Sequence, residues 1–212
     1  MYHCAVAEIT AFVLAGGQSS RMGKAKDKAF LMLADRSLLD RALALAGSLT
    51  SDVRISGSAV KFARFSPVVE DIYPQQGPLS GIHAALQQSA SELNLMLAVD
   101  LPFVEPGFLR YLVAQARASK ALATVPQTPD GWQPLCAVYR REFAKIAESA
   151  LREGRNRIDA LFLSSITHPI TGKEMINGGF SLAMFRNLNT PEELQAANDG
   201  WKKGRPNLNE HS

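Results

Sequence analysis

Cysteine is scarce in this sequence. Only Cys4 and Cys136 occur among 212 residues, and they lie far apart with no C-x-x-C pattern. This spacing argues against a disulfide framework or a cysteine-bound metal and is typical of a reduced protein. No apolar run approaches the roughly 18 residues of a transmembrane helix, and the N-terminus lacks the basic and apolar segments of a secretory signal. We therefore predict a cytoplasmic protein that does not enter a membrane.

An excess of one charge is also absent. Lys and Arg total 23 against 20 Asp and Glu, a formal net charge of +3, which is too small to predict nucleic-acid binding. Among the four histidines, His83 falls on a predicted helix and His168 precedes a proline, and neither has a partner at metal-ligand spacing. We interpret both as structural or surface groups. The sequence offers no credible protein nucleophile.

Internal repeats and interdomain linkers are missing as well. A chain of this length can bury a substantial core, so we predict a single domain over residues 1–200. Residues 201–212 are polar and contain Gly, Pro and Asn, so we predict that they form a mobile C-terminal tail.

What the sequence does contain is an apolar run from Ile9 that ends abruptly at Gly16 and Gly17. Such a run is typical of a strand buried on both faces in a parallel sheet. The two glycines let the backbone turn sharply and come close to a ligand. Four cations follow closely, at Arg21, Lys24, Lys26 and Lys28. Strand, glycine turn and cations together predict a polyphosphate site, although the spacings of the dinucleotide fingerprint and of the P-loop are absent.

Strand and helix patterns alternate along the rest of the chain. Strands are predicted at residues 9–15, 53–56, 67–70, 93–99, 121–126, 133–139 and within 178–185. Helices are predicted at residues 37–49, from 78 onward, at 105–118, 141–151 and 157–163, and from 191 onward. This alternation predicts an α/β three-layer sandwich, with a mostly parallel, Rossmann-like twisted sheet and helices on both faces.

Two further segments carry functional signals. In Gly77-Pro78-Leu79-Ser80-Gly81, Pro78 suits the first turn of a helix and Gly81 allows close packing, so the amides at the helix start can face an anion. Asp100 directly follows the most apolar strand, at the sheet edge where α/β folds collect ligands. A lone Asp there is often a helix cap, but a carboxylate also suits magnesium.

The last informative segment is Asn187-Leu188-Asn189-Thr190-Pro191-Glu192-Glu193. Thr190, Pro191 and Glu193 predict a helix start with a capping box. Capping does not explain Asn187 and Asn189, whose spacing lets both point the same way.

Together these segments resemble the molybdenum cofactor guanylyltransferases, nucleotidyltransferases with a dinucleotide-binding-like fold. The resemblance covers most of residues 9–198. It is carried by Leu14-Ala15-Gly16-Gly17 with Ser19, Arg21-Met22-Gly23 and Asp27-Lys28, by Gly77–Gly81, by Asp100-Leu101-Pro102-Phe103, and by Asn187–Pro191.

The resemblance implies transfer of GMP from GTP to the phosphate of molybdopterin or molybdenum cofactor, with release of pyrophosphate. It implies that Asp100 binds Mg²⁺ and is catalytic, and that Arg21 and Lys28 act as catalytic cations. It also implies that Asp71 accepts hydrogen bonds from the N–H groups of guanine. Delivery and acceptor proteins for the molybdenum cofactor are the partners that it suggests. The remaining implied binding residues are Leu14, Ala15, Gly16, Gly17, Ser58, Gly77, Pro78, Leu79, Gly81, Asn187 and Asn189.

Two departures from the family pattern leave alternatives open. The chain between Gly23 and Lys28 is longer than usual, so Lys26 competes with Lys28 for the phosphate role. Ser58 stands where the family usually has an asparagine at the base. A cytidylyltransferase acting on the same pterin, a sugar-phosphate nucleotidyltransferase and a non-catalytic nucleotide-binding module are the rival functions. Retention of both Lys28 and Asp100 argues against the last.

Overall fold

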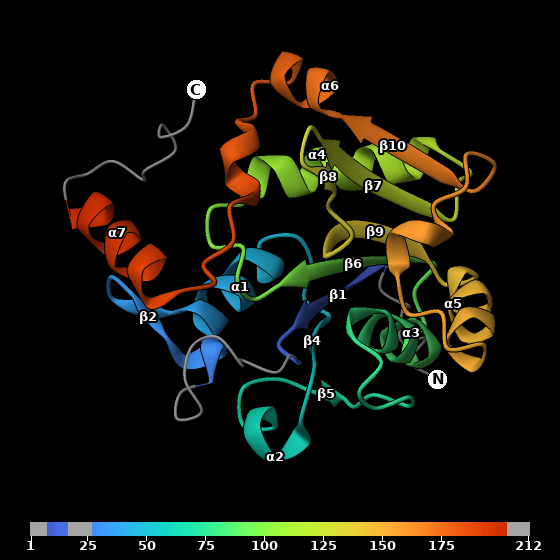
Figure 1. Cartoon of the computed structure of the whole chain (residues 1–212), viewed down its shortest axis with the longest axis horizontal. Helices are drawn as coiled ribbons and strands as arrows, with labels where there is room; N and C mark the ends of the chain where they lie inside the picture. Colours follow the sequence, from blue (N-terminus) through green and yellow to red (C-terminus); the bar gives the residue numbers. More distant parts are fainter. Residues whose placement is uncertain (1–7, 17–26, 203–212) are drawn as a thin grey trace, which may run out of the picture.

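The structure, a computed structural model, describes residues 8–16 and 27–202. Its main sheet has eight strands, in the order β10-β7-β9-β6-β1-β4-β5 with β8 beside β7 (Figure 1). The strands are β1 Ile9–Leu14, β4 Val53–Ser56, β5 Val68–Val69, β6 Leu93–Ala98, β7 Ala123–Thr128, β8 Gly131–Trp132, β9 Cys136–Arg140 and β10 Thr167–Thr171. The β6–β1–β4–β5 run is parallel, β9 is antiparallel to β6 and β7, and β10 is parallel to β7. The predicted mostly parallel sheet is confirmed, and β6 lies at its centre.

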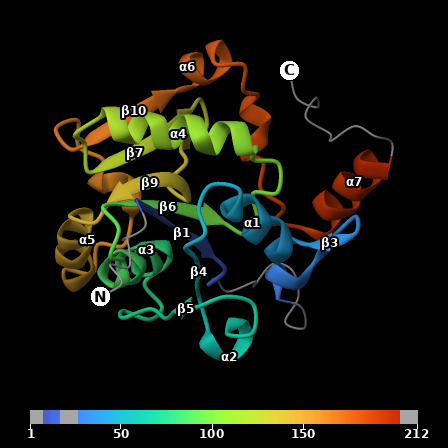
Figure 2. The same ribbon diagram turned by 180° about the vertical axis from the view of Figure 1, so that it is seen from behind.

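Helices cover both faces of this sheet (Figures 1 and 2). One face carries α1 Leu38–Gly47 and α4 Pro106–Ala118, and the other carries α3 Pro78–Gln88 and α5 Phe143–Arg152. Along β1, Val13 packs toward the first pair and Phe12 toward the second, because successive side chains of a strand point to opposite faces. Both residues are fully buried, which explains the unbroken apolar run.

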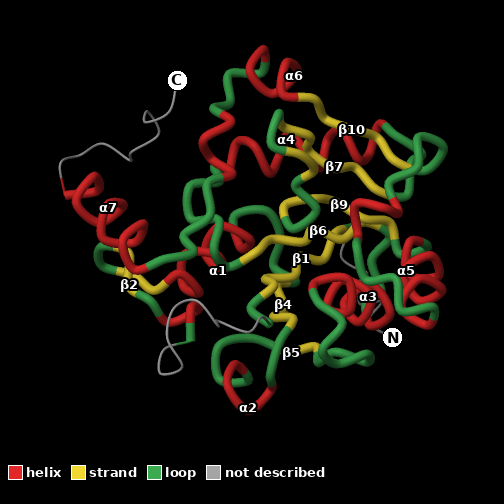
Figure 3. Tube along the Cα trace, in the orientation of Figure 1, coloured by secondary structure: helices red, strands yellow, loops and turns green. Residues whose placement is uncertain are grey.

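The remaining elements complete the fold (Figure 3). They are the helices η1 Lys28–Phe30, α2 Ala59–Phe62, η2 Ile158–Leu161, α6 Gly172–Asn177, η3 Leu182–Phe185 and α7 Pro191–Lys202, and a separate hairpin of β2 Met32–Leu33 and β3 Arg36–Ser37. Helix α7 packs on that hairpin: Asn198 donates to the Met32 carbonyl at 3.2 Å and accepts from the Ala34 amide at 2.6 Å. Among the described residues, no helix is both long enough and apolar enough to cross a membrane.

The strand predicted within residues 178–185 is wrong. Leu182–Phe185 is a 3-10 helix, and Ser181 caps it by accepting from the Ala183 amide. The segment buries its aromatic residues by turning rather than by extending: Phe180 and Phe185 each contact Phe108 of α4, with ring centroids 5.3 and 5.4 Å away. A four-residue apolar run is compatible with both a strand and a short helix, so the sequence pattern does not distinguish them.

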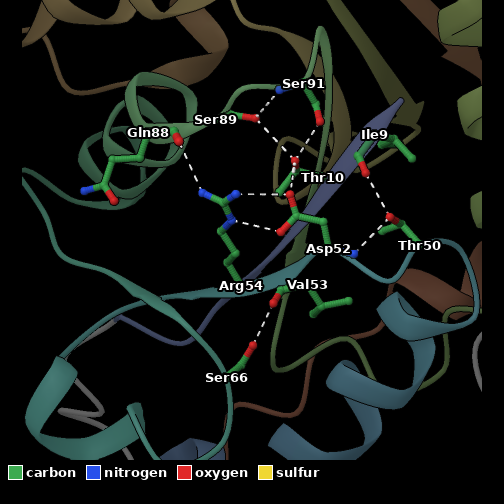
Figure 4. Close-up of polar contacts among 10 residues, drawn as sticks. All are labelled: Ile9, Thr10, Thr50, Asp52, Val53, Arg54, Ser66, Gln88, Ser89 and Ser91. Atoms are coloured by element: carbon green, nitrogen blue, oxygen red, sulfur yellow. Dashed lines mark hydrogen bonds and ion pairs between the residues drawn. The ribbon is translucent and has the colours of Figure 1, made fainter. Parts of the chain in front are cut away.

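A polar network holds the strands together at their amino ends (Figure 4). The fully buried Thr10 of β1 donates to Asp52 at 2.9 Å and shares a 2.8 Å hydrogen bond with Ser91, which precedes β6. Arg54 of β4 binds both carboxylate oxygens of Asp52, at 2.9 and 3.1 Å. Since β1, β4 and β6 are fastened here, their carboxyl ends are presented together at the opposite edge.

Candidate active site at the carboxyl edge of the sheet

The first component of the site is the turn after β1. The amides of Ala15 and Gly16 both donate to the Ser56 carbonyl, at 2.9 and 3.0 Å, so the chain leaves the sheet beside the end of β4. Among the described residues, a Cβ at Gly16 would meet Gly57 and Ser56, at 3.6 Å each, which is ordinary van der Waals contact. Three of the four expected cations, Arg21, Lys24 and Lys26, fall outside the described residues, as do the other motif residues Gly17, Ser19, Met22 and Gly23.

The second component is a three-residue cluster beside that turn. Lys28 Nζ lies 2.6 Å from Asp100 Oδ2 and 2.8 Å from Asn189 Oδ1. Lys28 starts η1, Asp100 follows β6, and Asn189 precedes α7, so three distant segments meet at one point. The side chains of Lys28 and Asp100 are only 16% and 22% exposed, and low exposure strengthens their attraction. The structure thus brings together three residues that the sequence singled out separately.

Backbone contacts hold Asp100 and Asn189 in place. The Leu188 amide donates to the Asp100 carbonyl at 3.2 Å. The Glu193 carboxylate accepts from the amides of Asn189 and Thr190, at 2.6 and 3.0 Å, while Thr190 Oγ1 accepts from the Glu193 amide. The predicted capping box is confirmed. Its reach to Asn189 was not anticipated, because a Thr-x-x-Glu spacing signals only the helix start.

The helix η1, which begins at Lys28, is anchored as well. Asp27 caps that helix by accepting from the Ala29 amide at 3.2 Å, and its other oxygen accepts from Lys61 of α2 at 2.7 Å. The Asp27–Lys61 pair therefore ties the segment that carries Lys28 to α2.

The third component lies at the start of α3, where Gly77 has a positive φ of 71° and Pro78 occupies the first turn. A Cβ at Gly81 would stand 2.8 Å from Ser56 Oγ and 3.5 Å from Asp71 Oδ1. It would also stand 4.0 Å from the Leu14 side chain. Gly81 thus makes room for Asp71 beside the end of β1. Asp71 is exposed overall, and partial desolvation of its carboxyl raises its pKa.

Other expected binding residues lie at the margin of this arrangement. Leu79 is fully buried, so its side chain belongs to the core, and Asn187 is exposed. Ser58 precedes α2 without a side-chain capping bond, and Glu70 accepts from the Ala59 amide instead, at 2.9 Å. The base-contact role of Ser58 stays a prediction.

The Lys28 cluster also suits a divalent metal. Two hard oxygens, Asp100 Oδ2 and Asn189 Oδ1, already converge on one cationic nitrogen. Magnesium is commonly held by one or two protein oxygens together with substrate phosphates. The described residues contain no group of three or more His, Cys, Asp or Glu side chains able to hold a metal. Any metal here would therefore depend on ligands from substrate and water.

Comparison with protein families gives a match over residues 11–166, to the MobA-like NTP transferase domain. The chain is 32% identical over 199 residues to the molybdenum cofactor guanylyltransferase of Desulfosudis oleivorans, covering 93% of this chain and 98% of that protein. It is 29% identical over 205 residues to the enzyme of the same name from Syntrophotalea carbinolica, covering 96% and 95%.

Solved structures give the same picture. Molybdopterin-guanine dinucleotide biosynthesis protein A from Archaeoglobus fulgidus superposes with a TM-score of 0.78 at 25% identity, over 92% of this chain and 99% of that one. The 2-C-methyl-D-erythritol 4-phosphate cytidylyltransferase of Thermus thermophilus superposes with a TM-score of 0.65 at 16% identity, over 92% and 99%. The latter likeness concerns the fold alone.

Proposed function

Because the chain belongs to the MobA-like NTP transferase family and is therefore a nucleotidyltransferase, we propose that it transfers GMP from GTP to molybdopterin or molybdenum cofactor. The acceptor's phosphate attacks the α-phosphorus of GTP, the bond to the β-phosphate breaks, and pyrophosphate leaves. The product is the guanine dinucleotide form of the cofactor. The observation that carries the proposal is the meeting of Lys28, Asp100 and Asn189 beside the turn after β1.

Both substrates are anionic, so this chemistry depends on charge neutralisation and alignment. The turn at Leu14–Gly16 lies at the edge where the triphosphate would bind, and Lys28 is proposed to stabilise charge on the departing pyrophosphate. Arg21 is the second cation proposed for that task. Magnesium, held by Asp100, would neutralise the phosphates and polarise the reacting phosphorus.

Asp71 is proposed to read the base. A carboxylate accepts hydrogen bonds from N1–H and the 2-amino group of guanine, and a base without those donors leaves it unpaired. Its position supports this role, because its carboxylate lies beside Gly81 and it follows β5, which ends at the same edge as β6 with β1 and β4 between them.

Room for a second substrate exists further along this edge. A hollow of about 410 Å³ lies where β7 and β10 end, lined by Gln127, Thr128 and Pro129 on one side and by Lys173, Ile176 and Leu182 on the other. Strand β7 runs in the same direction as β6, so this hollow and Asp100 lie at the same edge. We propose that the acceptor lies along the edge between them.

The test is transfer of α-labelled nucleotide to molybdopterin, with GTP and CTP compared for wild type, Asp71→Asn and Asp100→Asn. We expect labelled product from GTP only, loss of turnover with retained nucleotide binding in Asp100→Asn, and reduced preference for GTP in Asp71→Asn. Product from CTP instead of GTP would replace the proposal by cytidylyl transfer. Unchanged turnover in Asp100→Asn would refute the proposed chemistry.

A further inference from the structure

The ammonium group of Lys28 lies where a small cation would be expected. It contacts a carboxylate oxygen and an amide oxygen from two separate segments, at 2.6 and 2.8 Å. Oxygen donors of these kinds are also the ligands that a divalent metal takes. A lysine ammonium and a metal ion cannot share this position, because both need the same Asp100 oxygen and their charges repel.

We propose that Lys28 and a divalent cation use the Asp100–Asn189 oxygen pair in turn, with Lys28 holding it until a nucleotide arrives. When the triphosphate binds, Lys28 moves from Asp100 to the phosphate oxygens, and the oxygen pair becomes available to the metal that accompanies the nucleotide. The inference deepens the proposed function and rests on its assignment of a metal to Asp100. It assigns Asn189 as a second protein ligand of that metal.

The surroundings favour such an exchange. A lysine has a long flexible side chain and a point charge, so it can change partners without a fixed geometry. Asp100 and Asn189 are held through their backbones, by Leu188 and Glu193 respectively, so they keep their positions when Lys28 leaves. A nucleoside triphosphate carries several negative charges, which replace the Asp100 carboxylate as the electrostatic partner of the Lys28 ammonium group.

The exchange predicts coupling between metal and nucleotide. Without nucleotide, the metal must displace Lys28 and binds weakly; with nucleotide, that cost disappears. By linkage the metal strengthens nucleotide binding by the same factor, and couplings between sites are commonly about 5- to 150-fold.

The test measures Mn²⁺ binding without nucleotide, from the electron paramagnetic resonance signal of free Mn²⁺. Lys28→Met removes the ammonium and adds no oxygen donor, and we expect it to bind Mn²⁺ roughly 5- to 150-fold more tightly than wild type. Lys61→Met is the matched control, because Lys61 carries the same charge nearby but pairs with Asp27. We expect it to match wild type. Adding Asn189→Ala to Lys28→Met should weaken Mn²⁺ binding again.

The outcomes separate this inference from the proposed function. Equal Mn²⁺ affinity of wild type and Lys28→Met, with binding still lost in Asp100→Asn, would overturn the exchange and leave the metal role of Asp100 intact. Equal tightening by Lys61→Met would also overturn it, since general charge would then explain the effect. If Asp100→Asn binds Mn²⁺ as wild type does, with or without GTP, the metal assignment itself fails. Melting curves of each variant confirm that it is folded.

Discussion

The phenol ring of Tyr73 packs against the imidazole ring of His83, with the ring centroids 5.3 Å apart and the ring planes tilted by 59°. Tyr73 belongs to the loop between Asp71 and Gly77, and His83 lies in α3 with 1% of its surface exposed. Burial lowers the pKa of His83, so the ring is a neutral platform at pH 7. The Tyr73 hydroxyl contacts Glu148 and Arg152 of α5, at 3.4 and 3.3 Å. The loop that carries Asp71 is thereby fastened to two helices.

Removing this ring should weaken nucleotide binding without changing the chemistry. Tyr73→Ala is expected to raise KM for GTP roughly 2- to 13-fold, because an aromatic pair contributes about 0.5–1.5 kcal/mol beyond its area. The kcat should stay near wild type. Tyr73→Phe keeps the ring contact with His83 and is the matched control, expected within about twofold of wild type on the same grounds. A fall in kcat at unchanged KM would contradict this positioning role.

Adding one methyl group at Gly81 should disturb the site from within. In Gly81→Ala the new Cβ would lie 2.8 Å from Ser56 Oγ and 3.5 Å from Asp71 Oδ1. We expect a loss of about 1–3 kcal/mol in the free energy of unfolding, as for other overpacked sites, and weaker GTP binding by calorimetry.

Two companion variants make this prediction specific. Gly47→Ala in α1 has nothing within 4 Å of its new Cβ, so it should be neutral or stabilise by up to about 1 kcal/mol. Ser56→Ala removes the clashing oxygen, and combined with Gly81→Ala it should restore stability. A stable Gly81→Ala protein with normal GTP affinity would mean that the Ser56–Gly81 contact is not as close as described.

The network at the amino ends of the strands predicts a pH-dependent stability. Burial alone would raise the pKa of Asp52, but hydrogen bonds from Arg54 and Thr10 outweigh it and lower the pKa below its usual value. The ionised carboxylate therefore stabilises the fold above about pH 4, the pKa of an unfolded aspartate. This contribution disappears as the pH falls through the lowered pKa.

Asp52→Asn should accordingly cost about 1.5–3 kcal/mol at pH 7, the range for hydrogen bonds to charged groups. Urea unfolding at a series of pH values measures the difference, which should shrink toward acid. Glu153→Gln is the control, because its ion pair with Arg155 is exposed and should contribute nothing measurable. A difference that stays constant down to pH 2 would contradict the assigned ionisation.

The thiol of Cys136 should be chemically silent in the folded protein. The residue is completely buried in β9, and burial raises its pKa to about 12. The thiolate is the reactive form. In the Cys4→Ser variant, which leaves Cys136 as the one cysteine, the folded protein should therefore not react with Ellman's reagent until denaturant is added. Rapid labelling under native conditions would show that β9 opens readily.

Most of the fold could be predicted from the sequence, because buried strands and helices require a recognisable spacing of apolar residues. Strand β6 and the start of α3 were found closely, since a continuous apolar run and a proline in the first turn leave few other solutions. Strand β10 was missed because Pro169 interrupts Thr167–Thr171, and proline is tolerated there only because β10 lies at the sheet edge. Edge position is a property of the whole sheet and cannot be read locally.

The candidate site divides in the same way. Lys28, Asp100 and Asn189 were each indicated by a motif, whereas their mutual contact follows from tertiary folding. Tyr73 carried no sequence signal, because its role depends on which helices pack beneath its loop. Contacts of this kind depend on the tertiary structure and leave no local pattern in the sequence.

The C-terminal origin of Asn189 has a consequence for synthesis on the ribosome. Strands β1, β4, β5 and β6 all come from the first half of the chain, so most of the parallel sheet is translated early. Asn189 stands 161 residues beyond Lys28 and is translated only after all of these strands, together with its anchor Glu193. A polypeptide released prematurely would therefore contain the glycine turn and Asp100 but not the amide oxygen that contacts Lys28.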